Sequence, residues 1–128
     1  MDATIDNLER ALVQFYHSGS GQQAEAHKWL TQVQLSPDAW PVIWQLLQPN
    51  RSAEAQFFGA TTLHLKLMKS WSEVPSDQYA SLKNKLLETI LQYSAGPKLI
   101  LNRLCIAVSD TTRHLTHFRT QTIQRLYL

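Results

Sequence analysis

Apolar side chains recur at three- and four-residue intervals along most of the chain, the spacing of one face of an α-helix. Ile5, Leu8, Leu12 and Phe15 form the first such stripe, and segments rich in glycine or proline separate the later stripes. No segment shows the alternation of apolar and polar residues that is typical of a half-buried strand. The pattern therefore predicts an all-α protein. The six predicted helices cover about residues 4–17, 22–34, 36–47, 52–69, 76–94 and 98–108.

The third predicted helix contains a proline in its first half. Ser36, Pro37 and Asp38 are typical of a helix start, because a hydroxyl can cap free amides, proline needs no amide partner there, and an acid meets the positive end of the helix dipole. Pro41 lacks the N–H that would donate to the carbonyl four residues back. We therefore expect a bend at Pro41 or a later start of this helix.

The fourth predicted helix has one wide apolar side and one narrower side of small and polar residues. The apolar line runs through Phe57, Thr61, Leu65 and Met68, which indicates packing against neighbouring helices. We expect the opposite side to be exposed and to form the free surface of this helix. The residues predicted to lie on that exposed side are Ala55, Gly59, Thr62, Lys66 and Lys69.

The predicted helices fall into about three pairs. The first members of the pairs begin near Thr4, Ser36 and Ser76, so that the last two starts lie 40 residues apart. This interval suits HEAT-type repeats, in which antiparallel helix pairs of about 40–47 residues stack in an open row. A closed six-helix bundle would show similar loops and stripes, and the pattern alone leaves both architectures open.

Charge is unevenly spread along the chain. Residues 1–110 hold nine Lys and Arg against ten Asp and Glu, whereas residues 111–128 hold Arg113, Arg119 and Arg125 and no acid. The body is therefore close to neutral and lacks the basic stripe that nucleic-acid binding normally needs. We expect no nucleic-acid partner.

Candidate catalytic and metal-binding residues are sparse. His114 and His117 could share a helix face, but no further ligand follows at a suitable spacing, so we expect no metal site there. Cys105 lies in an apolar run and is expected to be a reduced core residue rather than a nucleophile. Phosphate-binding glycine loops and paired acids are also missing. The sequence predicts a protein that is not an enzyme and needs no cofactor.

The chain also lacks the marks of secretion or membrane insertion. Its first residues, Met1 to Thr4, are acidic and polar, and nowhere do eighteen apolar residues follow one another. We therefore expect no membrane span, and the single cysteine fits a reducing compartment.

Seven segments carry a resemblance to a known family through their order and spacing. They lie at residues 24–30, 36–40, 44–49, 56–64, 71–72, 75–79 and 99–108. Together they resemble the N-terminal domain of the importin-β (karyopherin) family of nuclear transport receptors, and the similarity runs from about Asp6 to Asp110.

This resemblance implies an α-α superhelix: a right-handed solenoid fragment of HEAT-like pairs whose second helices line a concave side. In that family the N-terminal repeats bind the small GTPase Ran in its GTP state, and the rest of the full-length receptor wraps cargo proteins. The resemblance thus implies nucleocytoplasmic protein transport, with a location in the cytoplasm and nucleus. The residues expected to contact Ran, as polar residues on the second helices, are Thr62, Lys66, Lys69 and Arg103.

The resemblance fades after about residue 110. We therefore expect two parts, a HEAT-repeat domain at residues 1–110 and a divergent basic tail at 111–128 that is weakly helical or disordered. Most of the cargo-binding arch would be missing. The alternative is a structural helical-repeat scaffold fragment that self-associates through its exposed last helix, or binds a partner without dependence on Ran. A helical repeat that binds RNA would require binding that weakens steeply with salt, and the near-neutral body disfavours it.

Overall fold

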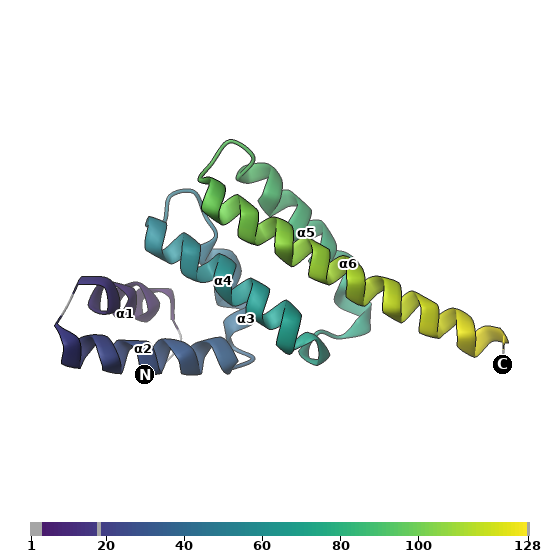
Figure 1. The fold of residues 1–128 in the computed structure, drawn as a ribbon, viewed down its shortest axis with the longest axis horizontal. Helices are drawn as coiled ribbons and strands as arrows, with labels where there is room; N and C mark the ends of the chain where they lie inside the picture. The colour runs from purple at the N-terminus through teal and green to yellow at the C-terminus, as the bar shows by residue number, and fades with distance from the viewer. Residues whose placement is uncertain (1–3, 18, 128) are drawn as a thin grey trace. The chain divides into compact units, whose positions relative to one another are not determined.

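The computed structural model describes the backbone of residues 4–17 and 19–127, and the side chains of this part up to residue 116. Six α-helices and two short 3-10 helices make up this part, which contains no strand (Figure 1). The prediction of an all-α, HEAT-like helical fragment is confirmed. The elements are α1 Ile5–His17, α2 Ser20–Leu35, α3 Ala39–Leu46, α4 Ala53–Lys69, η1 Trp71–Glu73, η2 Ser76–Gln78, α5 Tyr79–Gln92 and α6 Lys98–Tyr127.

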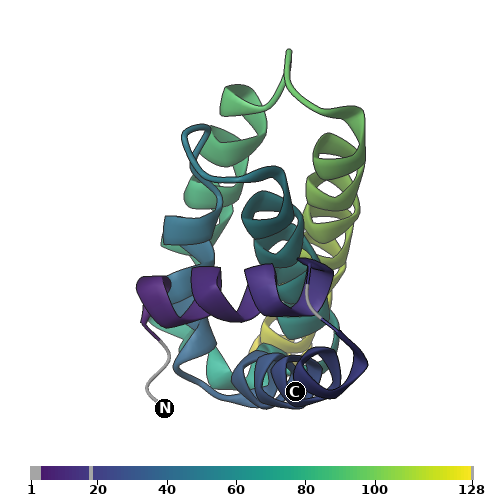
Figure 2. The same cartoon turned by 90° about the vertical axis from the view of Figure 1, so that its left-hand side faces the viewer.

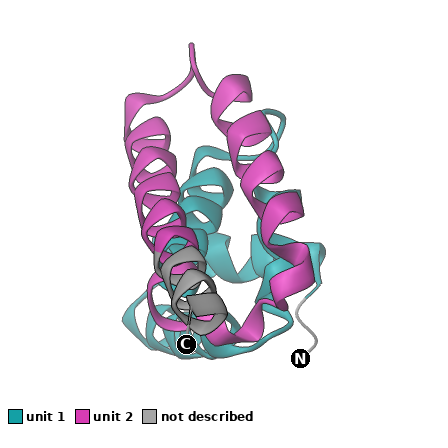
Figure 3. Ribbon diagram, turned by 90° about the vertical axis from the view of Figure 1, so that its right-hand side faces the viewer, with its two compact units in different colours: residues 1–66 teal, residues 67–128 magenta. Residues whose placement is uncertain are grey.

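The helices fall into two compact units, residues 1–66 and residues 67–128 (Figure 3). In the first unit α1 packs across α2, and both contact α3 (Figure 2). Its core is built from the predicted stripes: Leu8 and Leu12 of α1 meet Leu30 and Val33 of α2. Apolar burial of this kind is the main stabilising term, at about 1.5–3 kcal/mol for each large side chain.

The turn between α1 and α2 is shorter than predicted. We expected residues 18–21 to form it, but α2 begins at Ser20, so that Gly21 is helical. Gly19 precedes the helix in an extended conformation, and the Gly19 carbonyl accepts a hydrogen bond from the Gln23 amide at 2.9 Å. Gly21 therefore carries the conformational-entropy cost of a glycine within a helix.

The later start predicted for the third helix is confirmed. α3 begins at Ala39, which places Pro41 in the first turn, where a missing N–H breaks no helical hydrogen bond. The Ser36 hydroxyl oxygen accepts a hydrogen bond from the Asp38 amide at 3.2 Å just before this start. The sequence Ser36-Pro37-Asp38 therefore forms the turn that leads into α3.

In the second unit, η1 and η2 lead into the antiparallel pair α5 and α6. Leu82 and Leu86 of α5 and Ile100, Leu104 and Ala107 of α6 are buried. The Ala95-Gly96-Pro97 segment separates the two helices, as predicted, because proline cannot continue the preceding helix.

The last helix is much longer than predicted. We expected it to end near Val108, but α6 continues to Tyr127. Thr111 is buried, and its hydroxyl donates to the Ala107 carbonyl at 2.9 Å, so the helix crosses the predicted boundary at residue 110 without a break. Of the two predicted states for the tail, helical or disordered, the backbone of residues 111–127 takes the helical one. The predicted division into a HEAT-repeat domain and a divergent tail stays a prediction. No helix in the described part is long and apolar enough to cross a membrane.

Candidate partner-binding surfaces

The prediction for the two sides of α4 is wrong. Four of the five residues expected on its exposed side are buried, Ala55, Gly59, Thr62 and Lys66, and only Lys69 is exposed. A Cβ atom on Gly59 would lie 3.0 Å from the Leu46 Cβ and 3.2 Å from the Leu47 Cγ, which shows how closely α4 approaches the end of α3. Small residues mark this side because they permit the close approach. We call Ala55, Gly59, Thr62 and Lys66 the packing face of α4.

Two predicted contact residues lie on this packing face. The Thr62 hydroxyl accepts a hydrogen bond from the Gln34 side-chain amide of α2 at 3.0 Å. Lys66 has a relative exposure of 0%, so its side chain is fully covered by the surrounding fold. Neither side chain is accessible to another protein in this structure. The small residues at positions 55, 59 and 60 were the sequence signal that could have indicated the true packing side.

The open side of α4 is the line predicted to be its core. Phe57, Thr61 and Leu65 are half-buried, and Met68, one turn further, is 44% exposed. Aromatic and methionine side chains are enriched in protein interfaces. We call Phe57, Thr61, Leu65 and Met68 the open face of α4.

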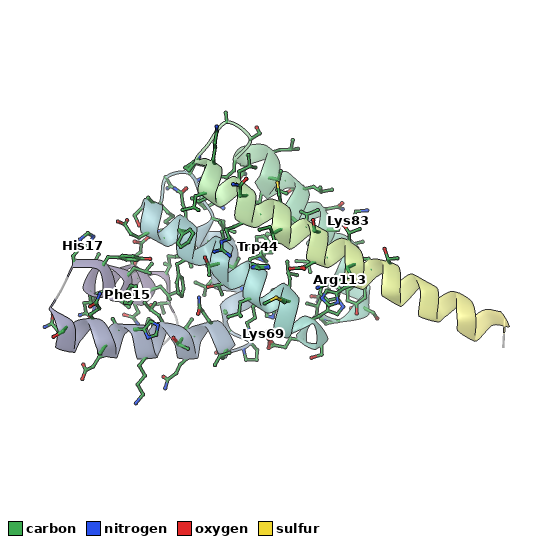
Figure 4. All side chains as sticks on the ribbon, viewed as in Figure 1. Phe15, His17, Trp44, Lys69, Lys83 and Arg113 are labelled. Atoms are coloured by element: carbon green, nitrogen blue, oxygen red, sulfur yellow. The ribbon has the colours of Figure 1, made fainter. Side chains whose placement is uncertain are left out.

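A second open face follows α6. Leu99 and Ile106 are 60% and 45% exposed, and Arg103 is half-buried between them in sequence. Arg113, which is labelled in Figure 4, continues the line at helical spacing. Its guanidinium group donates a hydrogen bond to the Asp110 carboxylate at 3.1 Å. We call Leu99, Arg103, Ile106 and Arg113 the open face of α6. Exposed apolar residues flanked by arginines are typical of a protein-binding surface.

The prediction that Cys105 is a core residue, which its apolar neighbours suggested, is wrong. It is a free thiol with an exposed side chain. The buried line of α6 runs through Ile100, Leu104, Ala107 and Thr111, and position 105 points away from that line. A segment that is apolar at most of its positions does not show which side of a helix faces the core.

In the second unit, His114 packs against an aromatic ring and contacts a backbone carbonyl. Its ring stacks on that of Trp71, with centroids 4.6 Å apart, and Trp71 in turn contacts the ring of Tyr79. The Nε2 atom lies 2.8 Å from the Leu67 carbonyl oxygen, so Nε2 carries the proton and donates. This carbonyl belongs to the last turn of α4, where no further helical amide can reach it. His114 therefore caps α4.

No group of three metal-binding side chains occurs among the described residues. The other half of the predicted pair, the His117 side chain, lies outside the described part. The arrangement described above offers apolar and basic surface for contact, and of the candidate residues for chemistry His114 serves in capping and stacking while Cys105 is an exposed thiol.

Comparison with known proteins decides the family. Residues 26–92, just over half of the chain, match the Importin-beta N-terminal domain. The chain belongs to the importin-beta family. The matched region contains α3, α4 and α5 and therefore the whole open face of α4.

Relatives from distant organisms share this similarity. Importin-13 of Homo sapiens is 46% identical over 111 residues, and Importin-13 of Gallus gallus is 34% identical over the same length. Importin-13 homolog A of Dictyostelium discoideum is 30% identical over 117 residues. These alignments cover 86–88% of the chain but 11–12% of the relatives, so the chain spans about an eighth of the length of the importins that it matches.

Proposed function

We propose that the chain is the Ran-GTP-binding portion of a nuclear transport receptor and acts in protein transport between cytoplasm and nucleus. The match to the Importin-beta N-terminal domain is the observation that supports this proposal. In this role the chain supplies a docking surface and performs no catalysis, and cargo proteins are held by other parts of the receptor.

The open faces of α4 and α6 are the proposed Ran contacts. Phe57 and Leu65 on α4 and Ile106 on α6 would be covered by the GTPase, which removes apolar surface from water. Of the four residues that the sequence predicted to contact Ran, Lys69 and Arg103 remain proposed contacts, because Lys69 is exposed and Arg103 is half-buried. Thr62 and Lys66 instead support the contact from the packing face of α4.

Binding to immobilised Ran tests this proposal. The chain should bind Ran loaded with a non-hydrolysable GTP analogue at least tenfold more tightly than Ran loaded with GDP, a difference of about 1.4 kcal/mol. Equal affinity for the two states, or no binding to either, would contradict it.

The alternative is a scaffold that associates with itself. The exposure of Leu99 and Ile106 on α6 favours this second candidate, because exposed apolar residues can pair between copies. Sedimentation without Ran separates the two. A mass that rises with concentration, and falls to that of a monomer when Leu99→Glu is introduced, supports self-association, whereas a monomer at every concentration excludes it.

A further inference from the structure

A hollow lies between α1 and α2 in the first unit and shares no residue with the open faces of α4 and α6. Its volume is about 210 Å³. Ala11 of α1 and Ala26 of α2 are both buried and form its base, and the half-buried Trp29 lines it. Since an apolar cavity of about 150 Å³ holds a benzene ring, this hollow has room for one aromatic or branched aliphatic side chain.

Charges of both signs border the hollow. Arg10 extends from α1 and Glu25 from α2, and both side chains are exposed. Within the described part of the chain neither of them forms an ion pair. An apolar base with one cation and one anion at its edge disfavours a ligand of a single charge sign, because such a ligand would be attracted at one edge and repelled at the other.

We infer that this hollow binds a segment of a partner protein that inserts one apolar anchor residue and carries an acidic residue on one side of the anchor and a basic residue on the other. The anchor gains affinity by leaving water above Ala11 and Ala26 and beside Trp29. The acidic residue pairs with Arg10 and the basic residue with Glu25, which orients the segment. This site is separate from the proposed Ran contacts and does not depend on them.

The test uses the full 128-residue chain and a short synthetic peptide with a central phenylalanine, flanked by one glutamate and one lysine. Titration followed by NMR should shift the amide signals of the residues that line the hollow. Replacing the central phenylalanine with serine should weaken binding by about tenfold or more. Peptides with two glutamates or two lysines should bind about two- to fivefold more weakly than the mixed peptide.

Substitutions in the chain test whether the peptide binds in the hollow. Ala26→Leu fills the base and should abolish binding, whereas Ala24→Leu, on an exposed position of the same helix, should leave it unchanged. Arg10→Glu should weaken binding by about two- to fivefold, and adding Glu25→Arg should restore it, because the peptide can then bind in the reverse direction.

Circular dichroism confirms that each variant is folded, and the two surface variants decide the question if Ala26→Leu does not fold. The inference is overturned if the serine peptide binds as well as the phenylalanine peptide, if the second charge change fails to restore binding, or if the shifted amides lie outside α1 and α2. It is also overturned if the shifts arise from pairing of two copies of the chain, which sedimentation would detect.

Discussion

Lys66 and Lys69 stand three residues apart on α4 but differ fully in environment. Lys66 is buried, and Lys69 is exposed. A brief pulse of an acetylating reagent should therefore modify Lys69 and leave Lys66 intact, because the Lys66 amine is reached only when this part of the fold opens. Mass spectrometry of the digested protein measures both sites, and the same pulse in denaturant supplies the control. Equal modification of the two lysines in the folded protein would contradict the assignment of Lys66 to the buried packing face of α4.

Tyr93 is a second residue whose environment leads to a prediction. Its side chain is 2% exposed, and burial raises the pKa of the phenol above 10.0 because the phenolate loses its hydration. Its hydroxyl has no hydrogen-bond partner among the described residues. Near neutral pH, Tyr93→Phe should change the free energy of unfolding by less than about 1 kcal/mol, since no hydrogen bond is lost.

The pH dependence of the same variant follows from the direction of this pKa change. Because the pKa of Tyr93 is higher in the folded than in the unfolded chain, its contribution to stability is fully present below about pH 10 and is lost as the pH rises through the folded value. Chemical denaturation between about pH 9 and 11 should show a smaller loss of stability for Tyr93→Phe than for the parent. Parallel curves for the two proteins would show that Tyr93 is not buried.

At the scale of the helix, two glycines form a matched pair. Gly59 faces the end of α3, whereas a Cβ on Gly21 would meet nothing within 4 Å. Gly59→Ala should lower the free energy of unfolding by about 1–2 kcal/mol, because the cost of overpacking exceeds the gain in helix propensity. Gly21→Ala should raise it by about 0.4–1 kcal/mol. Thermal and urea unfolding measure both, and stabilisation by Gly59→Ala would argue against the close approach of α3 and α4.

His114 connects elements that are far apart in the sequence. It caps the last turn of α4 from α6 and stacks on Trp71. His114→Ala should cost about 1–2 kcal/mol, because it leaves the Leu67 carbonyl without its donor and removes the ring contact. Asn102→Ala, at an exposed position of α6, serves as the control and should stay within about 0.5 kcal/mol of the parent.

Prolines, glycines and capping residues allowed the existence and the approximate starts of the helices to be predicted. Pro41 and the Gly96-Pro97 pair act through their own backbone, so their effects can be read without tertiary information. The orientation of α4 could not be predicted in the same way. Phe57 and Leu63 lie on different sides of this helix, and hydrophobicity alone does not decide which of them is covered. Contact with α3 decides it, and this contact depends on small residues that a hydrophobic wheel counts as neutral.

The extent of α6 was missed for a related reason. Beyond residue 110 the chain becomes polar, which suggested the end of the helix, but Thr111 is buried and His114 caps α4. Tertiary contacts of this kind extend a helix that its own composition would not maintain. The set of proposed Ran contacts changed with the orientation of α4. Thr62 and Lys66, which we expected to be exposed, are buried, whereas Lys69 is exposed and Arg103 is half-buried.

At the scale of the whole molecule, the composition agrees with the kind of partner that the proposed function assigns. The formal net charge is +2, which is small for a nucleic-acid-binding domain of this length. The proposed function, which rests on the match to the Importin-beta N-terminal domain, assigns a protein partner instead. The apolar open faces of α4 and α6 are suited to such partners, because they leave surface that a second protein could remove from water.

The most direct test of the account is the affinity for GTP-loaded Ran of two matched variants, Ile106→Glu and Leu87→Glu. Both replace an apolar residue of similar exposure, 45% and 43%, with the same charge, but only Ile106 lies on the open face of α6. We predict that Ile106→Glu weakens binding by at least about tenfold, as expected for a central contact, and that Leu87→Glu stays within about twofold of the parent. Unchanged binding by Ile106→Glu, or an equal loss of affinity in both variants, would contradict the proposal that the open face of α6 contacts Ran.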